Sequence, residues 1–146
     1  MAGPILAKIF SKRLKHLLET QMVERPDILL PVPIHQKRLR HRGFNQTEYF
    51  AKIIAKEISV PANGGIVSRV KYEKPQAGLS RAQRLMNVKN AFQVKSGNHY
   101  QHVAIIEDVV TTGSTVLAMT EALLQTGNIQ KVSIWSLAKN ITSETI

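Results

Sequence analysis

The chain of 146 residues contains no cysteine. This absence excludes disulfide bonds and every metal site that needs a thiolate ligand, and it suits a reducing compartment. Long apolar runs are missing as well: Lys8 interrupts the apolar N-terminal stretch, and no segment approaches the roughly 18 residues of a membrane-spanning helix. No segment resembles a convincing signal peptide, so we expect a soluble cytoplasmic protein without a membrane span.

Acidic residues are scarce. The chain has 10 Asp and Glu against 20 Lys and Arg, a formal net charge of +10 at pH 7. The positive charges cluster at 35–42, which holds no acid, and at 69–89, and this clustering predicts an anionic partner. Part of the charge can instead serve a small phosphorylated ligand or simply face water. The candidates for nucleic-acid contact are Lys37, Arg38, Arg40, Arg42, Arg81 and Arg84.

Apolar runs alternate with amphipathic stretches along the chain. This alternation predicts one α/β domain over 1–146, with a parallel sheet of about five strands flanked by helices. We expect an N-terminal amphipathic helix within 1–25 and a frayed tail at 139–146. The predicted strands are 28–32, 66–70, 91–94, the run from 103, and 132–137; the predicted helices are 5–19, one after Asn45, 81–87 and 115–126.

Residues between the first predicted strand and the next helix form a basic segment, 34–43, which we expect to be a loop at the carboxyl end of that strand. Asn45 can cap the helix that follows, with Glu48 completing a variant capping box. Phe44 is expected to pack as a hydrophobic staple or core residue, with base stacking as the alternative. Ser80 and Gln83 predict a second capping box.

The segment from 103 to 115 carries the most informative pattern. Four apolar residues end in two adjacent carboxylates, Glu107 and Asp108, and a hydroxyl-rich loop with one glycine leads into a helical pattern. The free N–H groups and positive dipole end at such a helix start form a seat for a phosphate. Carboxylates just before the seat can accept hydrogen bonds from two neighbouring sugar hydroxyls. The residues of the predicted phosphate loop are Val109, Val110, Thr111, Thr112, Gly113, Ser114 and Thr115.

This pattern predicts a ribose 5-phosphate site. The alternative is an ordinary strand-to-helix turn whose Asp and Thr side chains act as solvent-facing caps. Other common motifs are missing, because neither G-x-x-x-x-G-K-[ST], G-x-G-x-x-G nor H-E-x-x-H occurs in the chain.

The same segment resembles the phosphoribosyl pyrophosphate (PRPP) loop of type I phosphoribosyltransferases. Other segments narrow the resemblance to the ComF family, the competence-associated phosphoribosyltransferase-like proteins of bacteria, and cover roughly residues 28–138. The family often has Asp-Asp where this chain has Glu107 and Asp108. Many members also carry an N-terminal cysteine zinc module, which is either lost here or lies outside this sequence, so no zinc is expected in this chain. The segments are 31–35 with the basic run to 46, then 74–81 and 84–88.

The resemblance implies a Mg²⁺-dependent reaction in which PRPP loses pyrophosphate from C1 of its ribose while an unidentified nucleophile attacks that carbon. It implies that the loop at 109–115 holds the 5-phosphate. Glu107 and Asp108 would be the catalytic acids that grip the ribose hydroxyls and help to hold Mg²⁺. The candidates for binding the pyrophosphate are Lys37, Arg38, Arg40, Lys74 and Arg81.

Three functions are compatible with these residues. The first is a phosphoribosyltransferase of the competence type that acts in natural transformation and DNA uptake. The second is a non-catalytic factor that binds single-stranded DNA and uses the fold as a scaffold. The third is a PRPP-sensing regulator. The implied partners are PRPP, single-stranded DNA and competence helicase or recombination proteins, and a homodimer stays open.

Overall fold

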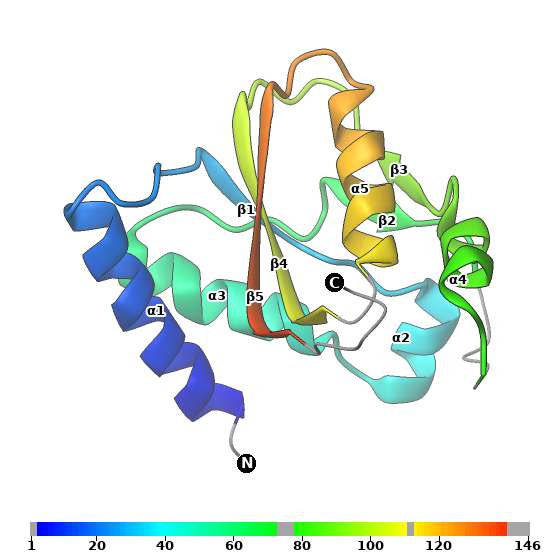
Figure 1. The fold of residues 1–146 in the computed structure, drawn as a ribbon, viewed down its shortest axis with the longest axis horizontal. Coiled ribbons are helices and arrows are strands. Elements are labelled where there is room, and N and C mark those ends of the chain that lie inside the picture. Colours follow the sequence, from blue (N-terminus) through cyan, green and yellow to red (C-terminus); the bar gives the residue numbers. More distant parts are fainter. Residues whose placement is uncertain (1–2, 73–77, 111–112, 140–146) are drawn as a thin grey trace.

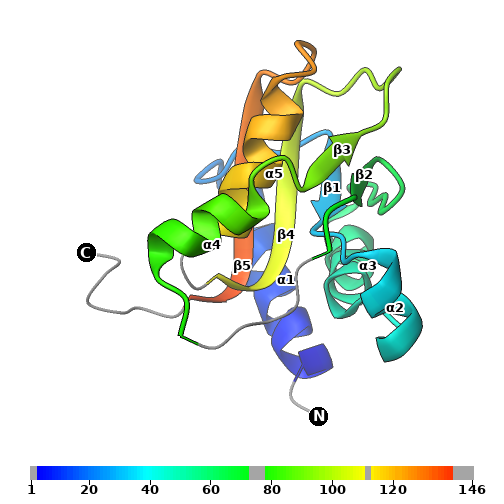
Figure 2. The ribbon, with the colours of Figure 1, turned by 90° about the vertical axis from the view of Figure 1, so that its right-hand side faces the viewer.

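The computed structural model describes residues 3–72, 78–110 and 113–139. Its central sheet contains three parallel strands in the order β1 (Ile28–Pro31), β4 (His102–Val110) and β5 (Lys131–Lys139). Helices α1 (Gly3–Glu19) and α3 (Gln46–Ile58) pack on one face, and α5 (Ser114–Leu124) packs on the other (Figures 1 and 2). The predicted α/β class, with a parallel sheet flanked by helices, is confirmed.

The five strands do not form the single parallel sheet that the sequence predicted. All five predicted strands form, but β2 (Val67–Arg69) and β3 (Phe92–Val94) pair with each other in an antiparallel ribbon outside the parallel sheet. In both, one residue is buried and the next is exposed, which is typical of a ribbon with one solvated face. The chain between them reverses through α4 (Arg81–Val88), so β3 returns beside β2 instead of joining β1 and β4.

The core lies on both faces of the parallel sheet. Successive side chains of β4 point to opposite faces, so Val103 and Ile105 pack toward α5, whereas Ala104 and Ile106 pack toward α1 and α3. Burial on both sides explains why β1 and β4 read as continuous apolar runs. Trp135 of β5 is only 8% exposed, which confirms its predicted place in the core.

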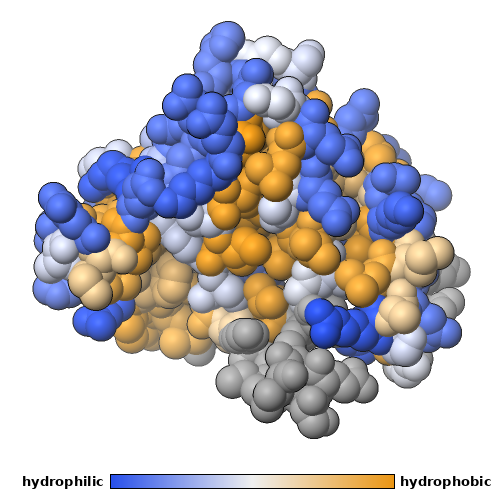
Figure 3. Space-filling view, turned by 45° about the horizontal axis from the view of Figure 1, so that its top comes forward, coloured by the Kyte–Doolittle hydropathy of each residue, from blue (hydrophilic) through white to orange (hydrophobic). Residues whose placement is uncertain are grey.

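The side of the sheet at β5 is open. Among the described strands, β5 pairs only with β4, and its second edge carries no strand. Apolar side chains reach the surface in the middle of the view in Figure 3, between hydrophilic margins. Ile134 of β5 and Leu117 of α5 are among the large apolar side chains that are exposed. Within the described part of the chain, no helix has the length and apolar character needed to cross a membrane.

The basic segment 34–43 is not a loop, and that prediction is wrong. Residues 36–42 form a helix, α2 (Gln36–Arg42), because most of them are good helix formers. The N-terminal cap is His35, whose Nδ1 accepts the N–H of Lys37 at 3.1 Å, and histidine is not among the usual capping residues. Gly43 ends the helix at φ 84°, a left-handed conformation that favours glycine.

Asn45 caps α3 as predicted. Its Oδ1 accepts the N–H of Thr47 at 3.1 Å, while its Nδ2 donates to the carbonyl of Val32 at 3.1 Å. Asn45 therefore joins the end of β1 to the start of α3. Glu48 does not complete the predicted capping box, because it forms an ion pair with Lys52 at 3.6 Å instead. The predicted capping box of α4, Ser80 with Gln83, is confirmed.

We predict that Asn45→Ala lowers the free energy of unfolding by roughly 1–2 kcal/mol, because the cap and the bond to Val32 are lost together. Asn45→Asp keeps an acceptor for the cap and loses only the Nδ2 donor, so its loss is expected to be smaller. Urea denaturation followed by circular dichroism measures both. Equal stability of Asn45→Ala and the wild type would contradict this role.

Candidate active site

The carboxyl ends of the parallel strands meet at one edge of the sheet. The β1–β4 pairing ends with Pro31 opposite Ile106, followed by a 3.0 Å bond from the N–H of Val32 to the carbonyl of Ile106. Beyond this point β1 leads into α2, whereas β4 continues beside β5 to Val110. The same edge holds the start of α3 and the start of α5 (Figure 1). In open α/β sheets, ligands bind at this edge.

Glu107 lies where β4 has lost its neighbour β1. It is half-buried, and its Oε1 accepts the N–H of Asp108 at 3.0 Å and the hydroxyl of Thr47 at 3.4 Å. The pKa of Glu107 is raised to about 8. Burial of the carboxyl is the main cause and the neighbouring Asp108 side chain adds to it, whereas the bonds from the Asp108 N–H and from Thr47 act in the opposite direction. In the chain without ligand, Glu107 therefore holds its proton at neutral pH.

Asp108 is also half-buried, and its Oδ1 accepts the N–H of Val109 at 2.8 Å. Adjacent residues of a strand normally point to opposite faces, but the Asp108 side chain still reaches that of Glu107, since it is one of the causes that raise the Glu107 pKa. Glu107 lines a small hollow of about 40 Å³ at the start of α5, and Asp108 is not among the described residues that line it. The structure therefore brings one acid of the predicted pair into the hollow and leaves the other beside it.

The start of α5 forms the opposite wall of this hollow. Gly113 is the N-cap, at φ 80° and ψ 0°, and because it has no side chain it cannot cap the first N–H groups itself. Such a helix start can bind an anion through its backbone. Helix α5 begins at Ser114, one residue before the predicted start, and Ser114 is buried. The lining residues from the predicted phosphate loop are Val109, Val110, Gly113, Ser114 and Thr115.

The predicted basic residues occupy two helices at this edge. In Figure 2, α2 and α4 lie on opposite sides of the lower end of β4. Helix α2 carries four exposed basic side chains, and α4 carries two, of which Arg84 is half-buried. Three predicted site residues, Lys74, Thr111 and Thr112, lie outside the described residues. Of the predicted tail at 139–146, residue 139 belongs to β5 and residues 140–146 lie outside the described residues. The described basic candidates are Lys37, Arg38, Arg40 and Arg42 on α2, and Arg81 and Arg84 on α4.

Two residues near the site were not predicted. Thr47 contacts Glu107 across 60 positions of sequence, and nothing local in the sequence pairs them. Tyr72 rests against α2: its ring lies 5.2 Å from that of His35, and Nζ of Lys37 lies 5.6 Å from the Tyr72 ring centroid. The sequence did contain one signal for Tyr72, because it is an aromatic residue at the start of a polar segment. Its contacts attach this end of the loop to α2.

Comparison with known proteins identifies the family of this chain. The family profile described as the phosphoribosyl transferase domain matches residues 46–145. Competence protein F of Haemophilus influenzae is 32% identical over 137 residues, which are 92% of this chain and 59% of that protein. The DNA utilization protein YhgH of Escherichia coli strain K12 is 31% identical over 136 residues, 93% of this chain and 60% of that protein. This chain thus spans about three fifths of the length of these curated relatives.

Solved structures share the fold. A hypoxanthine phosphoribosyltransferase from Staphylococcus aureus superposes with a TM-score of 0.55 at 19% identity, covering 92% of this chain and 64% of that one. A purine phosphoribosyltransferase from Pyrococcus horikoshii gives 0.54 at 16% identity, covering 94% and 72%. The expected type I phosphoribosyltransferase fold and the resemblance to the ComF family are confirmed. The chain therefore belongs to the phosphoribosyl transferase domain family and is, within it, similar to the competence-associated ComF proteins.

Proposed function

We propose that this chain binds PRPP at the carboxyl edge of its sheet and transfers the ribosyl phosphate group, with loss of pyrophosphate, to an acceptor that the site leaves open. The observation that carries the proposal is the hollow between Glu107 and the glycine-capped start of α5. One wall offers backbone donors for a phosphate, and the other offers a carboxyl group for sugar hydroxyls. We propose that the chain acts in the cytoplasm. A chain without cysteine needs no disulfide bond and is compatible with that reducing compartment.

Each wall has a distinct task in this proposal. The start of α5 holds the 5-phosphate, together with Ser114 and Thr115. As pyrophosphate leaves, positive charge develops at C1 of the ribose, and carboxylates fixed nearby stabilise that charge without having to reorganise. The basic residues of α2 and α4 flank the same edge and are placed to attract the departing pyrophosphate.

The residues at this edge fit a magnesium ion. Glu107 and Asp108 supply carboxylate oxygens, the hard donors that Mg²⁺ prefers. No group of three or more His, Cys, Asp or Glu side chains suited to a metal occurs among the residues that the structure describes. A pair of acids is enough for Mg²⁺, which commonly binds one or two carboxylates together with substrate phosphates. When bound, the ion would neutralise charge on the pyrophosphate, and Glu107 and Asp108 would hold it.

We predict that Asp108→Asn and Glu107→Gln each weaken Mg²⁺-dependent PRPP binding by at least about tenfold, the size expected for the loss of a hydrogen bond to a charged group. Isothermal titration calorimetry with PRPP, with and without Mg²⁺, measures the effect. Glu121→Gln, which removes an exposed acid on α5, serves as the matched control and should bind normally. If both site variants bind like this control, the assigned site is wrong.

The raised pKa of Glu107 makes a separate prediction about stability. The folded chain keeps this proton up to about pH 8, whereas the unfolded chain releases it near the ordinary value of 4.5. The contribution to stability is therefore complete below about pH 4.5 and is lost as the pH rises through 8. Above pH 8, Glu107→Gln should be more stable than the wild type by roughly 2 kcal/mol, after allowance for solvent screening of a half-buried group.

Urea denaturation of the unliganded protein across this pH range checks the difference. The advantage of Glu107→Gln should shrink toward pH 5, where the Glu107 carboxyl of the folded chain is protonated and is therefore neutral like the Gln side chain. Glu121→Gln should follow the wild type at every pH. A constant difference between Glu107→Gln and the wild type would show that burial of the carboxyl has no such effect.

Contact with single-stranded DNA is a second candidate function. The observation that favours it is α2, a short helix with four exposed cations and no acid. Two relatives are named competence protein F and DNA utilization protein, and we propose that this chain likewise acts in natural transformation, with competence helicase or recombination proteins as partners. Pyrophosphate release, assayed with and without DNA, distinguishes an enzyme from a non-catalytic DNA-binding factor or a PRPP-sensing regulator.

Reversing the four charges of α2, by changing Lys37, Arg38, Arg40 and Arg42 to Glu, should weaken DNA binding and flatten its dependence on salt. Each lost phosphate contact is expected to lower the log–log salt slope by about 0.7 for a single strand. Fluorescence anisotropy at several salt concentrations measures the slope. Reversal of four exposed cations on other parts of the chain provides the matched comparison: Lys12, Arg13, Lys56 and Lys95. An unchanged slope excludes α2 as the contact.

A further inference from the structure

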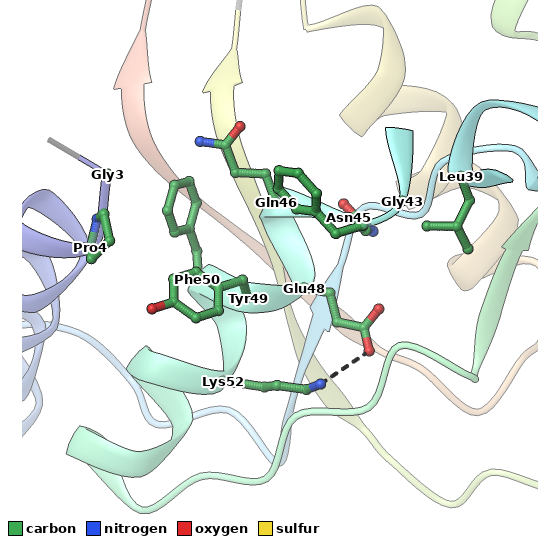
Figure 4. A pocket seen from close by; sticks show the side chains of 11 residues that line it. Gly3, Pro4, Leu39, Gly43, Asn45, Gln46, Glu48, Tyr49, Phe50 and Lys52 are labelled. Atoms are coloured by element: carbon green, nitrogen blue, oxygen red, sulfur yellow. Dashed lines mark ion pairs between the residues drawn. The ribbon is translucent and has the colours of Figure 1, made fainter. Parts of the chain in front are cut away.

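A wide hollow lies beside the active-site edge, and the functions above do not use it. It encloses about 870 Å³ between the N-terminal end of α1, the C-terminal end of α2 and the first turns of α3. Figure 4 shows Gly3 and Pro4 on one side, Leu39 and Gly43 on the other, and Tyr49 and Phe50 between them. Most of its lining is apolar or aromatic.

The aromatic residues of this hollow are accessible. Phe44 is 58% exposed and Tyr49 is 50% exposed, so the prediction that Phe44 packs as a staple or core residue is wrong. The reason lies in the turn before it: Gly43 adopts φ 84° and ends α2, which leaves Phe44 on the short connection to α3. The Phe50 ring beneath is buried, and its centroid lies 6.4 Å from that of Tyr49. The exposed Tyr49 ring is thus supported by a buried aromatic side chain.

Positive charge borders the hollow on both sides. Arg42 is exposed and follows Leu39 by three residues, so it lies on the flank of α2 that lines the hollow. Lys8 is exposed and follows Pro4 by four residues on the corresponding flank of α1. The acid in the lining, Glu48, is paired with Lys52 at 3.6 Å. The surroundings therefore favour an anion, and an apolar protein segment alone would not require these charges.

We propose that this hollow holds an unstacked nucleobase of single-stranded DNA, with Phe44 and Tyr49 as the stacking surfaces and the cations of α2 on the adjacent phosphates. Exposed aromatic rings beside a basic groove are the combination that binds single strands without sequence preference. This inference rests on the proposed DNA contact of α2 and names where the base lies. A duplex keeps its bases stacked and cannot use the site.

The test uses fluorescence anisotropy with a labelled oligo(dT) of about 20 nucleotides, longer than the footprint of one small domain. Phe44→Ala and Tyr49→Ala should each weaken binding to the single strand by roughly tenfold, the size of one lost base–aromatic stack. Phe44→Trp should retain binding. The salt slope and the affinity for a duplex should not change, because the phosphate contacts stay. Met22→Ala, which removes an exposed apolar side chain elsewhere, is the control.

Three outcomes would overturn the inference in distinguishable ways. Normal single-strand affinity of the Phe44→Ala, Tyr49→Ala double variant, combined with a flattened slope for the α2 charge reversals, removes the base site and leaves the phosphate contact standing. Absence of oligo(dT) binding by the wild type removes both. If the double variant changes the sedimentation of the protein but not its affinity for DNA, a second copy of the chain occupies the hollow instead of a nucleobase.

Discussion

The site depends on one constraint: the pairing of β1 with β4 ends before β4 does. The two strands pair only as far as Pro31 and Ile106, and Pro33 lacks the N–H that a longer β1 would need. Beyond Ile106, β4 has a neighbour on one side only. Glu107 enters this space, and α2 and α3 begin beside it. A longer β1 would have sealed the edge and buried the acid pair beneath backbone.

The early end of the β1–β4 pairing also explains the raised pKa of Glu107 at this edge of the sheet. Glu107 stays half-buried against Thr47 and Asp108, and two carboxyl groups on neighbouring residues cannot both ionise without cost. The unliganded chain responds with a pKa of about 8 for Glu107. A positive centre placed between the two acids would remove that cost. The arrangement therefore suits a ligand that brings or develops positive charge, and it disfavours an additional anion at the acids themselves.

Local signals predicted much of this structure. The acid pair, the loop before α5, the Asn45 cap and the Ser80–Gln83 box are all encoded within a few residues, and the described parts of each lie where the sequence placed them. The failures involve distant or unusual partners. Helix α2 begins with a histidine cap, which the common capping rules omit. The pairing of β2 with β3 and the contact of Thr47 with Glu107 join segments far apart in sequence, so no local pattern reveals them.

The first turn of α3 connects the two candidate sites. Thr47 is buried toward the sheet and contacts Glu107, whereas Tyr49, two residues later and therefore nearly opposite on the helix, lines the wide hollow. The two sites thus lie on opposite sides of α3. A strand held in the hollow would not overlap PRPP, yet neighbouring nucleotides could reach the acid pair around the end of α3. Because Asn45 fixes that end to Val32, the spacing between the sites is set by the fold and does not require a moving loop.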